Sequence, residues 1–420
     1  MCENAQALRK SVRGFFGKSH IYHLKFLSLL RITKLSSINP ESHQAGRISY
    51  QTKSYFMKKV ISFAASPQNL LKISSIDKAF KKYRKEVKHM ICHAGYEEDE
   101  KSSLSSFEDL DFPRTTHYIS VGYGSHAAQT ATTMLEVEKI FLKENPDLVI
   151  LSGHQDATFA CGITASKMKI PIAHIDAGLR SFEKYNPEEI NRILTDVLCE
   201  YHFVSEHSAM KNLRDEGENS NRIFFTGNPL VDVLELYWSD MEESDVREQL
   251  QIGDADYLLA TFHRKENLKD EKHLGEIISM LNRLATQCKI VWLLPHQAYK
   301  FLTQSSINKK LSQEIKLTGP LPYIDFLALM YNAEAVITDS EGIQEETTYL
   351  GAQCITVRKF TERIVTLDVG TNQLVGFDFE KAEKNALDIL KGTLKPGRIP
   401  ELWDGKAAKR IVEFLIEEIE

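Results

Sequence analysis

From Met57 onward the chain alternates short, almost entirely apolar runs with longer stretches whose apolar residues recur at helical spacing. Continuous apolar runs of this length fit strands buried on both faces, and helical stretches between them fit crossover connections. The apolar runs lie at residues 59–65, 88–95, 147–153, 170–177, 201–206 and 222–227. The helical stretches lie near residues 68–84, 126–144, 157–168, 188–198 and 207–216. This pattern predicts a parallel sheet with helices on both faces.

The same alternation restarts after a charged, mostly helical stretch at residues 229–256. The further apolar runs lie at residues 257–262, 289–295, 315–319, 335–340 and 353–358, and the further helical stretches near 272–286, 322–332, 342–350, 379–392 and 405–419. A chain of 420 residues is also long enough for two domains. We therefore predict an α/β protein with two Rossmann-like, doubly wound domains, residues 57–232 and 233–420, and a ligand cleft between them. The last helix is expected to pack back on the first domain.

Residues 1–56 differ from the rest of the chain. They hold nine Lys and Arg residues against two acids, whereas the whole chain has a net charge of −6. Three explanations are open. The start is placed too early and Met57 is the true first residue, or the segment is a disordered extension, or it is a targeting signal. We expect this segment to be disordered or not translated.

The remaining composition excludes several classes of protein. No apolar stretch approaches the roughly 20 residues that cross a bilayer. The chain from Met57 onward is acidic, and an acidic protein is a poor general binder of nucleic acid. The cysteines are scattered without a C-x-x-C pair and the histidines are dispersed. We therefore expect reduced thiols in a cytoplasmic protein, with no disulfide framework and no metal site. Neither a G-x-G-x-x-G after a strand nor a phosphate-binding P-loop motif is present, so neither a dinucleotide oxidoreductase nor a P-loop kinase is supported.

Polar residues follow two predicted strands of the first half. His154 and Asp156 come after the run at 147–153, and Asp176 ends the run at 170–177. Ligands bind outside the carboxyl ends of strands in open α/β sheets, so these side chains are expected in the cleft. The alternative for Asp176 is a structural one, in which its side chain caps a turn.

The segment "NPEEINR" opens the helix that follows. Glu188 and Arg192 are four residues apart and therefore share one helix face. We expect the apolar residues of the other face to bury this helix: Ile190, Ile193, Leu194 and Leu198. A solvated surface ion pair is the alternative interpretation.

In the second half, "DSEGIQEE" follows an apolar run and begins a helix. Ser340 fits an N-cap, and Gly342 would let an anion approach the free backbone N–H groups. Glu346 is one turn further along and would be repelled by phosphate, so we expect it to accept hydrogen bonds from ribose hydroxyls. His263 and Arg264 end another strand and could neutralise a diphosphate. The alternative is an ordinary capped strand–helix unit.

The motifs in combination resemble the non-hydrolysing UDP-N-acetylglucosamine 2-epimerases over residues 57–418. The resemblance rests on "GSHAAQTATTMLEVEKIFLKENPDLVILSG", "IPIAHIDAGLRSFEKYNPEEINRILTD", "IFFTGNPLVDVL", "TFHRKEN", "TDSEGIQEETTYLGAQCITVR" and "TER…GTNQLVG". It implies a glycosyltransferase-B type fold, a homodimer, and a UDP-N-acetylhexosamine as substrate without any cofactor. It also implies elimination of UDP to a 2-acetamidoglucal and re-addition, which interconverts UDP-GlcNAc and UDP-ManNAc for cell-surface polysaccharide precursors.

The resemblance also assigns roles by motif position. Asp176, Glu188 and Arg192 match catalytic positions of the family. The nucleotide-contacting positions are matched by His263, which we also count as catalytic, and by Ser340, Glu341, Gly342, Glu346 and Arg363, with Phe326 near the uracil.

The chain departs from the family pattern at several of its site positions. Ser66 replaces an Arg of the first loop, and Lys72 matches the family's Lys only with one inserted residue. His154 stands where the family has a catalytic Asp, for which Asp156 could substitute. Asp176 replaces a Glu and Glu341 replaces a Gly. We therefore retain three alternatives: a hydrolysing epimerase that releases ManNAc and UDP, a catalytically weakened UDP-sugar binding protein and, more distantly, a glycosyltransferase.

Overall fold

The computed structural model describes residues 57–95, 107, 109–304 and 308–419. Residues Lys58–Glu420 form one compact unit. The expectation for residues 1–56 therefore lies outside the described residues. No helix in the described ranges is both long and apolar enough to span a bilayer.

The first sheet is parallel throughout and has the strand order β3-β2-β1-β4-β5-β6-β7. Its strands are β1 (Lys58–Ala64), β2 (Val87–Gly95), β3 (His117–Ser120), β4 (Leu148–Ser152), β5 (Ile172–Ile175), β6 (Tyr201–Val204) and β7 (Ile223–Phe225). Its helices are α2 (Pro67–Phe80), α4 (His126–Glu144), α5 (Asp156–Lys167), α6 (Pro187–Leu198) and α7 (His207–Asp215). Short 3-10 turns occupy Lys81–Tyr83 and Ser220–Arg222.

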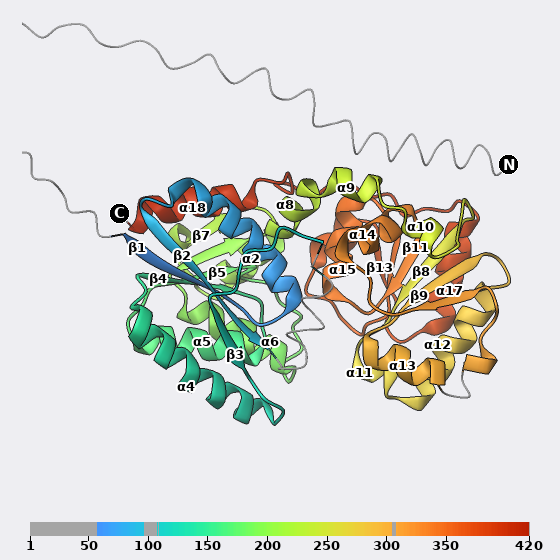
Figure 1. Cartoon of the computed structure of the whole chain (residues 1–420), viewed down its shortest axis with the longest axis horizontal. Coiled ribbons are helices and arrows are strands. Elements are labelled where there is room, and N and C mark those ends of the chain that lie inside the picture. Colours follow the sequence, from blue (N-terminus) through green and yellow to red (C-terminus); the bar gives the residue numbers. More distant parts are fainter. Residues whose placement is uncertain (1–56, 96–106, 108, 305–307, 420) are drawn as a thin grey trace, which may run out of the picture. The chain divides into compact units, whose positions relative to one another are not determined.

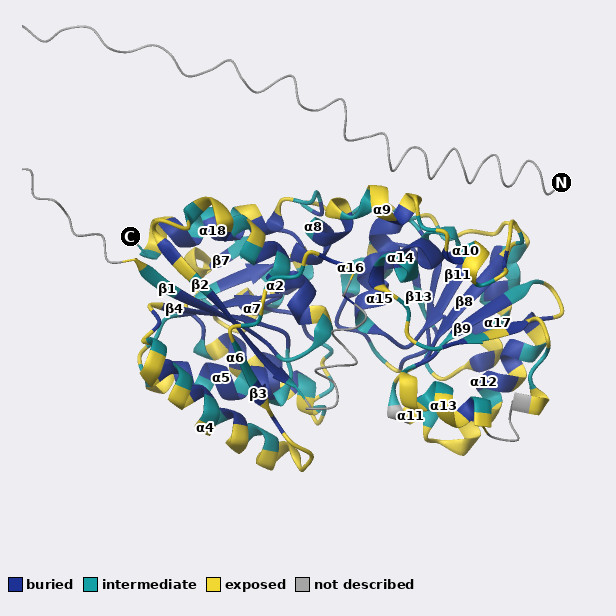
Figure 2. Ribbon diagram, in the orientation of Figure 1, coloured by how far each residue is buried: buried dark blue, intermediate teal, exposed yellow. Residues whose placement is uncertain are grey.

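Alternation along β1 explains why helices cover both faces of this sheet. Val60 and Ala64 point into a core shared with α2, whereas Ile61 and Phe63 point into a second core with α4 and α5. The central strands of both sheets are accordingly buried, as Figure 2 shows. The final helix, α18 (Ala407–Ile419), contributes Ile411 to the first of these cores and contacts α2.

The second sheet is also parallel and has the order β10-β9-β8-β11-β12-β13 (Figure 1). Its strands are β8 (Tyr257–Thr261), β9 (Lys289–Leu293), β10 (Ile315–Thr318), β11 (Ala335–Thr338), β12 (Cys354–Thr356) and β13 (Asn372–Leu374). Its helices are α11 (Lys265–Leu268), α12 (Glu271–Leu284), α13 (His296–Gln304), α14 (Tyr323–Asn332), α15 (Glu341–Leu350), α16 (Ile364–Asp368) and α17 (Phe379–Leu390), with a 3-10 turn at Asn308–Lys310. Three helices connect the two sheets: α8 (Pro229–Leu236), α9 (Trp238–Glu242) and α10 (Val246–Gln249).

The predicted fold class is confirmed, because both sheets are parallel and have the doubly wound strand order. Strand order reverses between β1 and β4 in the first sheet and between β8 and β11 in the second. The short edge strands β3 and β13 were not predicted. The boundary between residues 232 and 233 stays a prediction, and α8 runs through it.

Candidate active site

One pocket lies where the strand order of both sheets reverses. Its lining comes from the segments that follow β1, β4 and β5 in the first sheet and β8, β11 and β12 in the second. It encloses about 760 Å³ of empty space, part of it continuous with solvent. Of the predicted site residues, the structure places these at the pocket: Lys72, His154, Asp176, Glu188, Arg192, His263, Ser340, Glu341, Gly342 and Arg363.

Helix α2 brings Lys72 to the pocket. Ser66 begins this helix as its N-cap, with its hydroxyl accepting a hydrogen bond from Asn69 N at 3.3 Å, and Pro67 occupies the first turn. Lys72 lies farther along α2 and is buried. Its ammonium contacts the carboxylate of Asp176 and lies 3.3 Å from that of Glu345. Lys72, which follows the first strand of the first sheet, thus meets Asp176 of the first sheet's side and Glu345 of helix α15 on the second sheet's side.

Asp176 follows β5 in a left-handed backbone conformation, with φ of 65°. Gly178, two residues later, has φ of 79°, and a Cβ there would lie 2.3 Å from the carbonyl oxygen of Ala209. This tight turn aims the Asp176 carboxylate at Lys72 and at Arg363 Nη2, 3.3 Å away. Burial alone would raise the pKa of Asp176, but these two cations hold its pKa below the usual range.

Arg363 is the cation with the most carboxylate partners in the pocket. Its guanidinium lies 3.0 Å from Glu341, 3.0 Å from Glu345 and 3.3 Å from Asp176. Burial alone would lower the pKa of Arg363, yet the surrounding carboxylates raise it well above its usual value. The guanidinium is therefore permanently charged and is held between both halves of the unit.

Helix α6 is oriented opposite to the prediction. Its polar residues are buried, whereas Ile190, Ile193 and Leu194 are about two-fifths exposed and Val197 is 66% exposed. Only Leu198 of the predicted apolar face packs against a core. The prediction was wrong because periodicity identifies the two faces of a helix without saying which face meets the protein.

The buried polar face of α6 supports both the loop before it and the pocket. Glu189 accepts hydrogen bonds from the backbone N–H of Ser181 at 2.8 Å and of Phe182 at 2.9 Å, and it lies 3.3 Å from Arg192. Arg192 in turn lies 3.6 Å from Glu362. Of the acid and arginine cluster at residues 176–192, Asp176, Glu188 and Arg192 thus line the pocket, while Glu189 positions Arg192.

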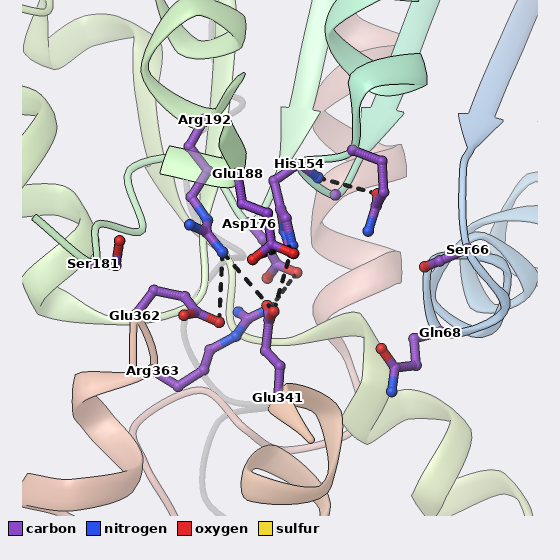
Figure 3. Close-up of polar contacts among 12 residues, drawn as sticks. Ser66, Gln68, His154, Asp176, Ser181, Glu188, Arg192, Glu341, Glu362 and Arg363 are labelled. Atoms are coloured by element: carbon purple, nitrogen blue, oxygen red, sulfur yellow. Dashed lines mark hydrogen bonds and ion pairs between the residues drawn. The ribbon is translucent and has the colours of Figure 1, made fainter. Parts of the chain in front are cut away.

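His154 lies between two carboxylates. Its Nε2 is 3.8 Å from Glu188 and 3.5 Å from Glu341 (Figure 3). Burial, together with Arg192, lowers the pKa of His154 to about 3, although Glu188 acts in the opposite direction. The imidazole is therefore neutral near pH 7 and can donate one hydrogen bond and accept one.

The second sheet contributes a helix N-terminus. Ser340 is the N-cap of α15, yet its side chain makes no hydrogen bond to that helix. The helix begins inside the pocket, and a Cβ at Gly342 would lie 2.9 Å from the Gln68 side chain. His263 Nδ1 lies 2.8 Å from Asp339, which also accepts a hydrogen bond from Arg264 N at 3.1 Å. The uncapped N-terminus of α15 and the side chain of Arg264 thus both lie at the pocket, an arrangement that suits an anion.

Three predicted site residues do not line this pocket. Asp156 accepts hydrogen bonds from Asn191, at 3.0 Å, and lies beside His126. Phe326 packs against the core around α14. Glu346 is buried and accepts a hydrogen bond from the hydroxyl of Tyr323 at 2.7 Å. Their contacts with a ligand stay predictions.

Other residues at the pocket were not predicted. They include Gln68 and Asn69 on α2, His174 and Glu345. His174 donates from Nε2 to the carbonyl of Gly153, 3.1 Å away, and its Nδ1 lies 2.7 Å from the carboxylate of Asp196, so it positions the strand ends. Glu345 directly precedes Glu346 in "GIQEE", so the sequence already marked this position as a candidate. Which of the two acids faces the pocket depends on the phase of the helix.

Comparison with known proteins gives consistent results. The family model described as UDP-N-acetylglucosamine 2-epimerase matches residues 79–416. A UDP-N-acetylglucosamine 2-epimerase of Methanocaldococcus jannaschii is 36% identical over 86% of this chain and 99% of its own length. A UDP-2,3-diacetamido-2,3-dideoxy-D-glucuronate 2-epimerase of Pseudomonas aeruginosa is 32% identical over the same shares. The crystal structure of the M. jannaschii UDP-GlcNAc 2-epimerase in complex with UDP-GlcNAc and UDP matches with a TM-score of 0.76 and 35% identity, over 86% of this chain and 100% of that one.

Glu346 should make the stability of the protein pH dependent. Burial raises the pKa of Glu346 from 4.5 to about 7. The folded state therefore holds this proton where the unfolded chain has lost it, and the stabilising contribution present below about pH 4.5 is lost as pH rises through 7. Glu346→Gln cannot titrate and can still accept from Tyr323. Between pH 5 and 8 the wild type should lose on the order of 2 kcal/mol of unfolding free energy relative to this variant, measured by urea unfolding. Exposed Glu417→Gln is the control, and equal pH dependence of the wild type and Glu346→Gln would contradict the role.

Proposed function

This chain belongs to the UDP-N-acetylglucosamine 2-epimerase family, and we propose that it interconverts UDP-N-acetylglucosamine and UDP-N-acetylmannosamine. One observation carries the proposal: a single pocket combines cations and a helix N-terminus for a diphosphate with acid/base groups for a sugar ring. Epimerisation at C2 without an adjacent ketone needs both, because the carbon–hydrogen bond at C2 and the bond to the diphosphate must break together or in sequence.

The diphosphate is assigned to the first turn of α15. Arg363 and Arg192 lie beside this turn, and His263 and Arg264 approach it from the end of β8. In the proposed elimination, a base removes the proton at C2, the C1–oxygen bond breaks, and UDP leaves with the bonding electrons, which gives a 2-acetamidoglucal. Re-addition of UDP at C1, with a proton delivered to the other face of C2, completes the reaction. The cations stabilise the negative charge that develops on UDP.

Glu188 is the best placed of the carboxylates to transfer the proton. Its side chain is 35% exposed and its Oε2 has no hydrogen-bond partner among the described residues. Asp176, in contrast, is held as a carboxylate by Lys72 and Arg363. His154 lies 3.8 Å from Glu188, on the same side of the pocket, so we assign its neutral imidazole to orienting the Glu188 carboxylate.

The identity of the hexosamine is inferred from the named relatives. The P. aeruginosa relative is named for a diacetamido glucuronate, so this substrate is the alternative to UDP-N-acetylglucosamine. We take the N-acetylglucosamine form as the substrate because the M. jannaschii relative has the higher identity. The cytoplasm, where nucleotide sugars are made and used, is the proposed site of action.

A second copy of the chain is the proposed partner, and it would cover the exposed apolar face of α6. This face holds Ile190, Ile193, Leu194 and Val197, and α4 exposes Leu135 and Leu142. A face of this kind is costly to leave in water and is typical of an interaction surface. Because α6 carries Glu188 and Arg192 on its other side, such a dimer would also support the pocket.

The direct test is to incubate the protein with UDP-N-acetylglucosamine in deuterated water and follow it by proton NMR. We expect UDP-N-acetylmannosamine with deuterium at C2. Free N-acetylmannosamine and UDP would instead indicate a hydrolysing epimerase, and binding without exchange would indicate a UDP-sugar binding protein. A parallel incubation with UDP-2,3-diacetamido-2,3-dideoxy-D-glucuronate tests the alternative substrate.

Glu188→Gln should lower the exchange rate at least about 100-fold, since general acid–base catalysis contributes 10²–10⁴-fold. Its affinity for UDP in calorimetry should change little, because the amide keeps the side-chain shape. Glu183→Gln removes a carboxylate from the same loop region, outside the pocket lining, and is the matched control. Near-normal exchange by Glu188→Gln would remove this residue from the mechanism.

Val197→Glu should convert a dimer into a monomer, because it places a charge in the centre of the proposed apolar interface. Light scattering coupled to size-exclusion chromatography measures the mass. Phe301→Glu changes another exposed apolar side chain, 59% exposed on α13, and should leave the dimer intact. A Val197→Glu protein that keeps the dimeric mass, or a wild type that is monomeric, would contradict this interface.

A further inference from the structure

The pocket already contains a negatively charged group where an anionic ligand is expected. Glu341 is the first residue of α15, and its carboxylate points back into the pocket. It lies 3.0 Å from Arg363, 3.5 Å from His154 and 3.9 Å from Arg192, as Figure 3 shows. The side chain is only 11% exposed. Glu341 therefore contacts cations or a donor from three separate segments of the chain.

An acid in the first turn of a helix is common, because it complements the helix dipole. Glu271 illustrates this ordinary case: it is the first residue of α12, follows the N-cap Asp270 and is exposed. Glu341 differs in its burial and in its partners. Burial would raise the pKa of Glu341, but Arg363 and Arg192 hold its pKa well below the usual range. The Glu341 carboxylate therefore pairs with cations of the pocket, in addition to complementing the dipole of α15.

The cations that Glu341 meets are not fully satisfied. Arg192 Nη2 and Arg363 Nε have no hydrogen-bond partner among the described residues, although both are buried. The distance of 3.9 Å between Glu341 and Arg192 is an ion-pair distance and is too long for a hydrogen bond. A buried guanidinium N–H without a partner is unfavourable, so these donors favour an anion with more oxygens than one carboxylate offers.

The charges at the pocket lining, in contrast, oppose a further anion while Glu341 is in place. Among the described lining residues, the cationic side chains are Lys72, Arg192, Arg264 and Arg363, and the carboxylates are Asp176, Glu188, Glu341 and Glu345. These charges balance before any ligand is present, apart from the three histidines. A diphosphate would therefore add uncompensated negative charge, and it would do so beside Glu341. Like charges held this close are strongly repulsive in a desolvated site.

We propose that Glu341 is an internal counter-anion, which pairs with Arg363 beside Arg192 without nucleotide and is displaced by the diphosphate of a UDP-sugar. This inference rests on the proposed function, because it assigns the ligand's diphosphate to the same place. Glu341 thereby weakens nucleotide affinity and keeps Arg363 oriented between turnovers. Its effect is on the affinity for the diphosphate.

Calorimetric binding of UDP and of inorganic pyrophosphate tests the proposal in the wild type, Glu341→Gln and Glu271→Gln. The glutamine keeps the shape of Glu341 and removes its charge, so both probes should bind about tenfold more tightly. Glu271→Gln removes the same charge from the same helix position outside the pocket, and its affinities should equal those of the wild type. Ligand-free Glu341→Gln should also have a lower Tm, since Arg363 loses a partner, and pyrophosphate should restore it.

The outcomes separate this inference from the proposed function. UDP binding that is unchanged or weaker in Glu341→Gln, with normal binding by the wild type, overturns the counter-anion and leaves the function standing. Tighter binding of UDP without tighter binding of pyrophosphate also overturns it, because Glu341 would then oppose the nucleoside. If neither protein binds UDP, the proposed function fails together with the inference.

Discussion

The ion pairs around Arg363 are the interaction on which the rest of the site depends. This buried guanidinium lies within 3.3 Å of Asp176, Glu341 and Glu345, which come from both halves of the compact unit. Burying so many charges is unfavourable by itself, and removing one partner of a buried pair typically costs about 3–5 kcal/mol. Such a cluster is therefore weak evidence for a stabilising role and stronger evidence for a site that binds or transforms a charged ligand.

The fold explains why these charges meet. Both sheets have the same doubly wound order, and in each sheet the order reverses beside the first strand. The segments after β1, β4 and β5 in the first sheet and after β8, β11 and β12 in the second consequently supply the pocket, with α15 aiming its N-terminus into it. Helix α6 adds Glu188 and Arg192 because its polar face is turned inward. The apolar face on the other side of α6 stays exposed, and for this reason a second copy is proposed to bind there.

Much of this could be predicted from the sequence, for identifiable reasons. Buried parallel strands are recognisable as apolar runs, and polar residues at their ends, such as His154 and Asp176, must lie at the carboxyl edge. The edge strands β3 and β13 have four and three residues, which is too short for a clear periodic signal. The orientation of α6 could not be predicted, because which face is buried depends on the neighbours. The helix phase likewise decided that Glu345 lines the pocket while Glu346 meets Tyr323.

A crystal structure with UDP tests the central claim most directly, because it locates the diphosphate relative to both sheets. The account predicts phosphate oxygens within hydrogen-bonding distance of the Arg363 guanidinium and of the backbone N–H groups that open α15. Uridine diphosphate bound at another surface, with Arg363 still enclosed by its three carboxylates, would contradict it.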